Sequence, residues 1–206
     1  MNQSNLTRPQ ISESFPLGAA LTITGGFLDA YSYLTRGSVF ATAQTGNIVL
    51  LGLRLVKGEW SMVLHYLIPI LAFAAGVLAA DFFKYRFRGL ATVHWRQISV
   101  LAELLVLMGV AFLPHSLDNI ANICVAFICA VQVESFRKVN GNAFATTMCT
   151  GNLRSGTEHL FHFLRTGDRD HLHRMTQYYV IILFFILGAV LGSICCPAMG
   201  RQAALV

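Results

Sequence analysis

The stretch Phe40-Ala41-Thr42-Ala43-Gln44-Thr45-Gly46-Asn47 occurs a second time in looser form, as Phe144-Ala145-Thr146-Thr147-Met148-Cys149-Thr150-Gly151-Asn152. The offset between the two copies also places Asp29 onto Glu134, so each Thr-Gly-Asn follows a carboxylate at the same distance. A motif and an upstream acidic residue that recur together indicate an internal repeat. The chain is therefore predicted to consist of two related halves.

The composition places this repeat in a membrane. Of the 206 residues, 55% are hydrophobic and only 12% are charged, which is too apolar for an ordinary soluble protein. The runs 61–80 and 175–200 contain no Asp, Glu, Lys or Arg, and each is long enough for a spanning helix of about 20 residues. We expect a polar tail over residues 1–13 and a single transmembrane domain over residues 14–200.

The transmembrane domain is predicted to be all-α, with five to seven membrane segments. The first repeat covers about residues 17–83, an unrepeated span about 97–113, and the second repeat about 119–198. Small residues around Gly76 and Gly188 form a ridge in each half, which predicts close packing against another helix.

The two motif segments are too polar to be independent lipid-facing spans. A re-entrant arrangement gives five full crossings, places most Lys and Arg residues on one side of the membrane, and makes the two halves inverted repeats. A complete crossing by both motifs gives seven spans and parallel repeats. The charge bias favours five, and seven stays open.

Broken helices that meet near the middle of the membrane hold solutes and ions in many secondary transporters. Thr and Asn can cap such a break, and Gly accepts its backbone angles. The predicted substrate-binding residues are Gln44, Thr45, Gly46, Asn47, Thr150, Gly151 and Asn152. Asp29 and Glu134 are the predicted proton or coupling sites, because a carboxylate at membrane depth usually faces protein or water. In the alternative interpretation, all of these residues only pack helices together.

Other function classes find little support in the sequence. The net charge of +5 comes from basic residues that flank apolar spans, so no nucleic-acid partner is expected. Glu158, His159 and His162 fit no specific metal signature, and we expect neither a metal nor a cofactor. No nucleophile elbow, phosphate loop or zinc-protease helix occurs, so the chain is not expected to be an enzyme. Intramembrane catalysis through Asp29, Glu103 or Glu134 is a weaker alternative.

Three stretches carry a resemblance to a family. Gly26-Phe27-Leu28-Asp29-Ala30, the sequence from Val39 to Asn47, and the second Thr150-Gly151-Asn152 resemble the YoaK family of bacterial integral membrane proteins. The resemblance extends from about residue 15 to about residue 197. It implies a multi-span fold in the bacterial cytoplasmic membrane, with the lipid bilayer as partner, and it transfers no substrate and no catalytic residue.

The function expected from these observations is transport. We predict a permease for a small polar or anionic solute, with proton coupling through Asp29 or Glu134 and with homo-oligomers as a possible form. The alternative is a membrane scaffold or subunit that transports nothing.

Overall fold

The computed structural model describes residues 14–87, 95–136 and 149–206, and these residues form an all-helical structure. The predicted tail over residues 1–13 lies outside the described residues. Within the described ranges there are seven α-helices and two short 3-10 helices. They are α1 (Phe15–Thr35), α2 (Gln44–Val56), α3 (Trp60–Phe87), α4 (Trp95–Phe112), η2 (His115–Leu117), α5 (Asp118–Ser135), α6 (Cys149–Thr166), α7 (Arg169–Met199) and η3 (Gly200–Leu205).

Three of the described helical stretches are long and apolar enough to cross a membrane. They are Trp60–Arg86, His115–Ser135 and Arg169–Leu205. Only 22% of the apolar window is buried in the first and in the third, and large side chains such as Leu78 and Leu183 point outward. Exposed apolar surface on this scale suits lipid rather than water. The higher count of five to seven segments and the re-entrant path stay predictions.

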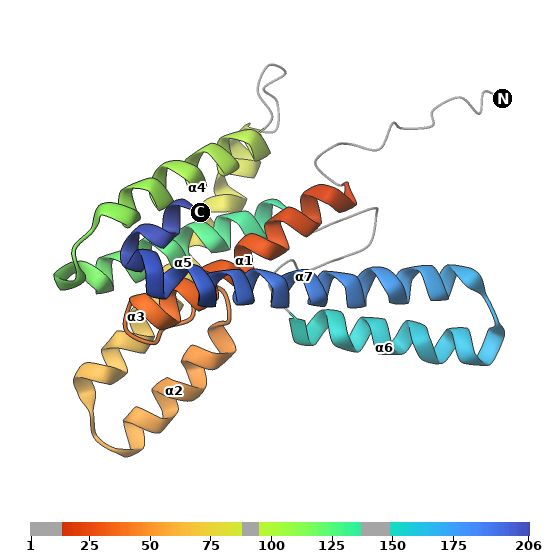
Figure 1. Cartoon of the computed structure of the whole chain (residues 1–206), viewed down its shortest axis with the longest axis horizontal. Coiled ribbons are helices and arrows are strands. Elements are labelled where there is room, and N and C mark those ends of the chain that lie inside the picture. The colour runs from red at the N-terminus through yellow and green to blue at the C-terminus, as the bar shows by residue number, and fades with distance from the viewer. Residues whose placement is uncertain (1–13, 88–94, 137–148) are drawn as a thin grey trace.

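Helices α1 and α7 lie against each other with their backbones in contact (Figure 1). A Cβ added to Gly188 would fall on the carbonyl oxygen of Ile23, and one added to Gly26 would fall on the carbonyl oxygen of Phe185. Glycine at these crossings permits a close approach that any side chain would prevent. The small residues predicted to pack against another helix therefore do so here.

The same kind of contact joins α3 to α5. A Cβ on Gly76 would fall on the carbonyl oxygen of Phe127 and would lie 2.8 Å from Cβ of Ala130. In both contacts, the third helix of one predicted half packs on the first helix of the other, since α1 and α3 fall in the predicted first repeat and α5 and α7 in the predicted second. Helix α2 packs on α3, and α6 packs on α7, as paired hairpins (Figure 1).

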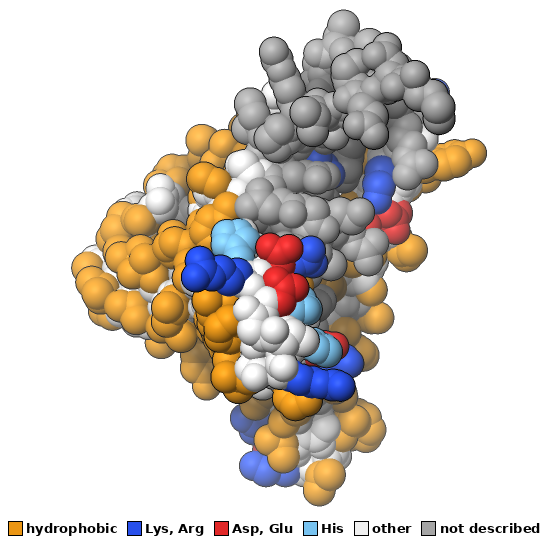
Figure 2. All heavy atoms as spheres, turned by 90° about the vertical axis from the view of Figure 1, so that its right-hand side faces the viewer, with side chains coloured by type: hydrophobic (Ala, Val, Ile, Leu, Met, Phe, Trp, Pro, Cys, Tyr) orange, Lys and Arg blue, Asp and Glu red, His pale blue; other side chains and the backbone are white. Residues whose placement is uncertain are grey.

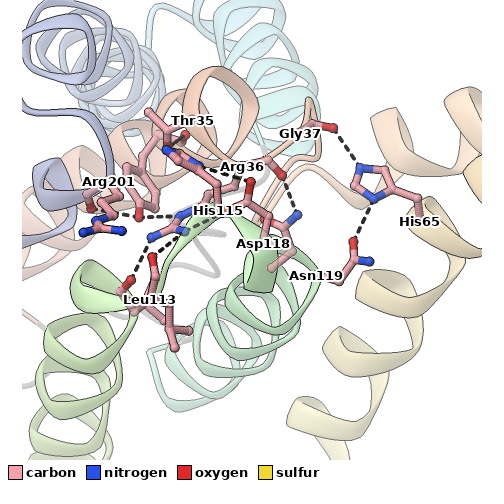
Figure 3. A network of polar contacts seen from close by, with 12 residues as sticks. Thr35, Arg36, Gly37, His65, Leu113, His115, Asp118, Asn119 and Arg201 are labelled. Carbon is pink, nitrogen blue, oxygen red and sulfur yellow. Dashed lines mark hydrogen bonds and ion pairs between the residues drawn. The ribbon is translucent and has the colours of Figure 1, made fainter.

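A buried arginine fixes the end of α1 to the segment between α4 and α5 (Figure 3). The side chain of Arg36 is completely buried, and its Nε donates to the Tyr31 hydroxyl at 2.9 Å. Its Nη1 donates to the carboxylate of Asp118 at 2.7 Å and to the carbonyl of Leu113 at 3.1 Å. Its Nη2 donates to the carbonyl of Val110 at 2.7 Å. Four bonds from one guanidinium join three helices at this end.

A histidine extends this network to α3. The ring of His65 lies with Nε2 at 2.8 Å from the carbonyl oxygen of Gly37 and with Nδ1 at 2.9 Å from Oδ1 of Asn119 (Figure 3). The C-terminal η3 also joins, because the Tyr31 hydroxyl donates to the carbonyl of Arg201 at 3.0 Å. The scaffold around the motif is thus anchored by polar contacts at one end and by helix crossings elsewhere.

Candidate functional site

Both copies of the repeated motif line one cavity of about 610 Å³. Gln44 and Thr45 contribute from the start of α2, and Thr150 and Gly151 contribute from the start of α6. Asp29 reaches the same cavity from α1. Pockets for small organic ligands usually measure about 300–1,000 Å³, so this volume suits such a molecule. The structure therefore brings together five of the nine residues predicted for the solute and coupling sites.

Most of the remaining lining is apolar and aromatic. The rings are Tyr33 of α1, Phe40 before α2, Phe73 of α3 and Phe185 of α7. Ser193 of α7 adds a hydroxyl. Among the described residues that line the cavity there is one carboxylate and no Lys, Arg or His. The cavity thus combines an apolar body with a few polar groups, as binding sites for organic ligands do.

Asp29 is buried, and its carboxylate accepts hydrogen bonds from the segment that precedes α2. Its Oδ1 accepts hydrogen bonds from the backbone N–H of Thr42 at 2.6 Å and of Ala43 at 3.4 Å. Its Oδ2 accepts from the Thr42 hydroxyl at 2.7 Å. The carboxylate also lies at the positive end of the α2 dipole, which attracts negative charge. Asp29 therefore has a structural role in addition to its place in the cavity wall.

Asn47 does not line the cavity, because its side chain clamps the backbone of Phe40. Its Oδ1 accepts from the Phe40 N–H at 2.9 Å, and its Nδ2 donates to the Phe40 carbonyl at 2.8 Å and to Oε1 of Gln44 at 2.9 Å. Glycine at position 46 leaves room for the Phe40 ring, since a Cβ on Gly46 would lie 2.8 Å from Cδ2 of that ring. The first Gly-Asn pair positions an aromatic residue of the cavity and the irregular segment around it.

In the predicted second repeat, the motif asparagine and the carboxylate also lie outside the cavity lining. Asn152 is buried on α6. Glu134 is buried near the end of α5, with its Oε1 at 3.8 Å from Nζ of Lys84 on α3. The structure thus separates Glu134 from Asp29. The sequence between α5 and α6, residues 137–148, lies outside the described residues, and so does the start of the second motif copy.

Apart from Asp29, the sequence interpretation missed the cavity residues that come from α1, α3 and α7. Aromatic residues in apolar spans usually face lipid or the core, so Phe73 and Tyr33 gave no signal. A signal existed on α7, where Phe185, Ala189 and Ser193 follow one another at intervals of four residues and all line the cavity. Residues spaced in this way share one helix face.

Charged and histidine side chains gather at the free end of the α6–α7 hairpin (Figure 2). There Nδ1 of His159 lies 2.9 Å from Nδ1 of His171, and the ring of His162 stacks on that of His171. Burial, followed by the nearby His171, lowers the pKa of His159. Within the described ranges, no group of three or more His, Cys, Asp or Glu residues is arranged to hold a metal ion.

Two comparisons relate this sequence to known proteins. The sequence model of the family "Protein of unknown function (DUF1275)" matches residues 17–206. The "UPF0700 transmembrane protein YoaK" of Bacillus subtilis (strain 168) is 25% identical over 186 residues, which cover 86% of this chain and 81% of YoaK. No solved structure gives a significant match. The resemblance predicted from the motif sequences is confirmed, and the chain is a multi-pass membrane protein homologous to a bacterial one.

Proposed function

We propose that this chain, which belongs to the DUF1275 family, is a permease that carries a small solute across the bacterial cytoplasmic membrane. One observation carries the proposal: two motif copies far apart in the sequence line a single cavity that is large enough for an organic molecule. A packing motif alone would not need to place both copies on the same open space.

The arrangement of the helices supports an internal repeat as the basis of transport. The first helix of each half packs on the third helix of the other half, and glycines at these crossings let the two backbones touch. Transporters built from repeats bind solutes where the halves meet and expose the site by moving one half against the other. The cavity lies at such a meeting point, between α1 and α2 of one half and α6 and α7 of the other.

Asp29 is the better candidate for proton coupling. It lines the cavity, so a change in its protonation acts directly on the solute site. Glu134 is buried beside Lys84 and away from the cavity lining, which suits an anchoring role. The re-entrant path of α2 and α6 belongs to the same proposal, because irregular backbone at membrane depth is tolerated where it lines a cavity.

A cavity-filling variant tests the proposal. Gly151 lines the cavity, and a Cβ built on it meets no described atom within 4 Å, so Gly151→Leu would add bulk to the cavity without disturbing the packing of the described residues. Gly52 on α2 is equally uncrowded and does not line the cavity, so Gly52→Leu is the matched control. Purified wild type and both variants would be screened for thermal stabilisation by ions, amino acids, amines, nucleobases, sugars and organic acids.

A solute at 100 times its dissociation constant adds about 2.7 kcal/mol to the stability of the protein that binds it. We expect wild type and Gly52→Leu to show such a shift and Gly151→Leu to lose it, and the same solute to enter liposomes that contain wild type. A folded Gly151→Leu protein that binds and transports like wild type would refute the cavity as the solute site. The absence of any ligand, together with a partner protein that co-purifies, would favour the scaffold alternative. Solute turnover abolished by Asp29→Asn would favour an intramembrane enzyme.

A further inference from the structure

We propose that the cavity binds an organic cation, namely an amine that carries an aromatic or similar apolar group. This inference rests on the proposed function for the cavity itself and adds the chemical class of the solute. The sequence alone suggested a small polar or anionic solute, and this inference departs from the anionic one. Three features of the cavity support it: the charge of its lining, its aromatic rings, and the occupied start of α2.

The first feature is the charge of the lining. Among the described residues that line the cavity, Asp29 is the only acidic one and none is basic. Asp29 accepts hydrogen bonds from the backbone N–H groups of Thr42 and Ala43, and the Thr42 hydroxyl lies 2.7 Å from its Oδ2. Donors placed in this way stabilise the ionised form of a carboxylate. An ionised Asp29 with no basic partner among the described lining residues attracts a cation and repels an anion.

The second feature is the aromatic part of the wall. Tyr33, Phe40, Phe73 and Phe185 come from four separate segments and meet around the same space. Aromatic rings attract ammonium groups through their negative faces, and they also bury the apolar part of an organic ligand. The rings of Tyr33 and Phe40 stack with centroids 4.9 Å apart, and the Asn47 clamp fixes the backbone of Phe40. This part of the wall is thus held in place by contacts within the protein.

The third feature removes the argument for an anion at the start of α2. Free N–H groups at the start of α2 would have favoured a negative solute. In the structure, the N–H groups of Thr42 and Ala43, immediately before α2, donate to Asp29. The protein therefore supplies its own anion at this position. A volume of about 610 Å³ is also far larger than a bare metal ion requires, so the cation is an organic one.

Three probes of similar shape and different charge test the inference. They are phenethylammonium, the neutral phenethyl alcohol and the anionic phenylpropanoate. Binding to the purified protein is measured by thermal stabilisation and by calorimetry, for wild type, Asp29→Asn and Asp81→Asn. Asp81 is an exposed carboxylate on α3 that does not line the cavity, so its variant controls for the loss of one negative charge.

We expect wild type and Asp81→Asn to bind phenethylammonium at least about tenfold more tightly than phenethyl alcohol, a difference of about 1.4 kcal/mol. Asp29→Asn should bind both about equally. Since Asp29 also holds Thr42, Phe73→Leu is a second variant that leaves the carboxylate in place; it should weaken phenethylammonium binding if the aromatic wall contributes.

Equal binding of the cation and the alcohol by wild type would overturn the inference and leave the proposed solute cavity intact. Tighter binding of phenylpropanoate, or binding of none of the three probes, would also overturn it. Binding of phenethylammonium without uptake into liposomes would uphold the cation site and refute transport. The two proposals therefore fail by different results.

Discussion

Replacement of Asn47 by alanine separates the two roles that a motif asparagine can have. In the structure, the variant loses three hydrogen bonds, two of them to the backbone of Phe40 and one to Gln44. Each bond is worth about 1 kcal/mol in soluble proteins and about 0.6 kcal/mol between membrane helices. Because Asn47 is fully buried, the loss should reach about 2–3 kcal/mol, measured as the free energy of unfolding in detergent.

Two further variants make this prediction specific. Gln44→Ala keeps both bonds between Asn47 and Phe40, so it should destabilise the protein less than Asn47→Ala does. Asn47→Asp keeps the acceptor for the Phe40 N–H but cannot donate to the Phe40 carbonyl, so most of the loss should remain. An Asn47→Ala protein as stable as wild type that no longer binds solute would refute the clamp and restore Asn47 as a ligand.

The remaining predictions concern helix packing, the buried arginine and pH. Gly76→Val should destabilise the protein strongly, since the new side chain meets the Phe127 backbone. Gly109→Val on α4 meets no described atom within 4 Å, and because valine is a slightly better helix former than glycine, this variant should be about as stable as wild type or slightly more stable; thermal unfolding compares the two. Arg36→Leu should cost about 3 kcal/mol in unfolding free energy, because it leaves buried partners unpaired. Lowering the pH through about 6.5 should reduce the stability of wild type more than that of His159→Gln. The pKa of His159 is lower in the folded protein than in the unfolded chain, so the unfolded chain binds the proton first as the pH falls. Melting temperatures measured across this pH range test the sign.

The sequence predicted the helical class and the helix packing because both depend on local patterns. Long uncharged runs mark spanning helices wherever they occur, as they do for α3 and α7. Small residues at intervals of four mark a helix face that another helix can approach, and Gly76 and Gly188 both lie at such crossings. Neither inference needed the partner helix to be known. The packing of each predicted half on the other could not be predicted, because neither pattern identifies the helix that will be contacted.

The cavity could be predicted only in part for the same reason. Polarity marked Gln44, Thr45 and Thr150 as candidate binding residues, and all three line the cavity. Polarity also marked Asn47 as a candidate binding residue, but its side-chain amide forms hydrogen bonds with the backbone of Phe40 and does not line the cavity. A buried amide that binds backbone and one that binds a ligand have the same composition and spacing. The two cases can be distinguished only from where the backbone of Phe40 lies, seven residues upstream of Asn47.

The double role of Asp29 determines how solute, proton and structure would be linked under the proposed function. The carboxylate lines the cavity and also accepts the N–H groups of Thr42 and Ala43. A bound cation and a proton both neutralise this carboxylate, so each lowers the affinity for the other by the same factor. Both also weaken the hold of Asp29 on the start of α2, while the Asn47 clamp keeps Phe40 in place. Exchange of a cation for a proton would therefore change the hydrogen bonds of the segment between Phe40 and α2, where the first repeat borders the cavity.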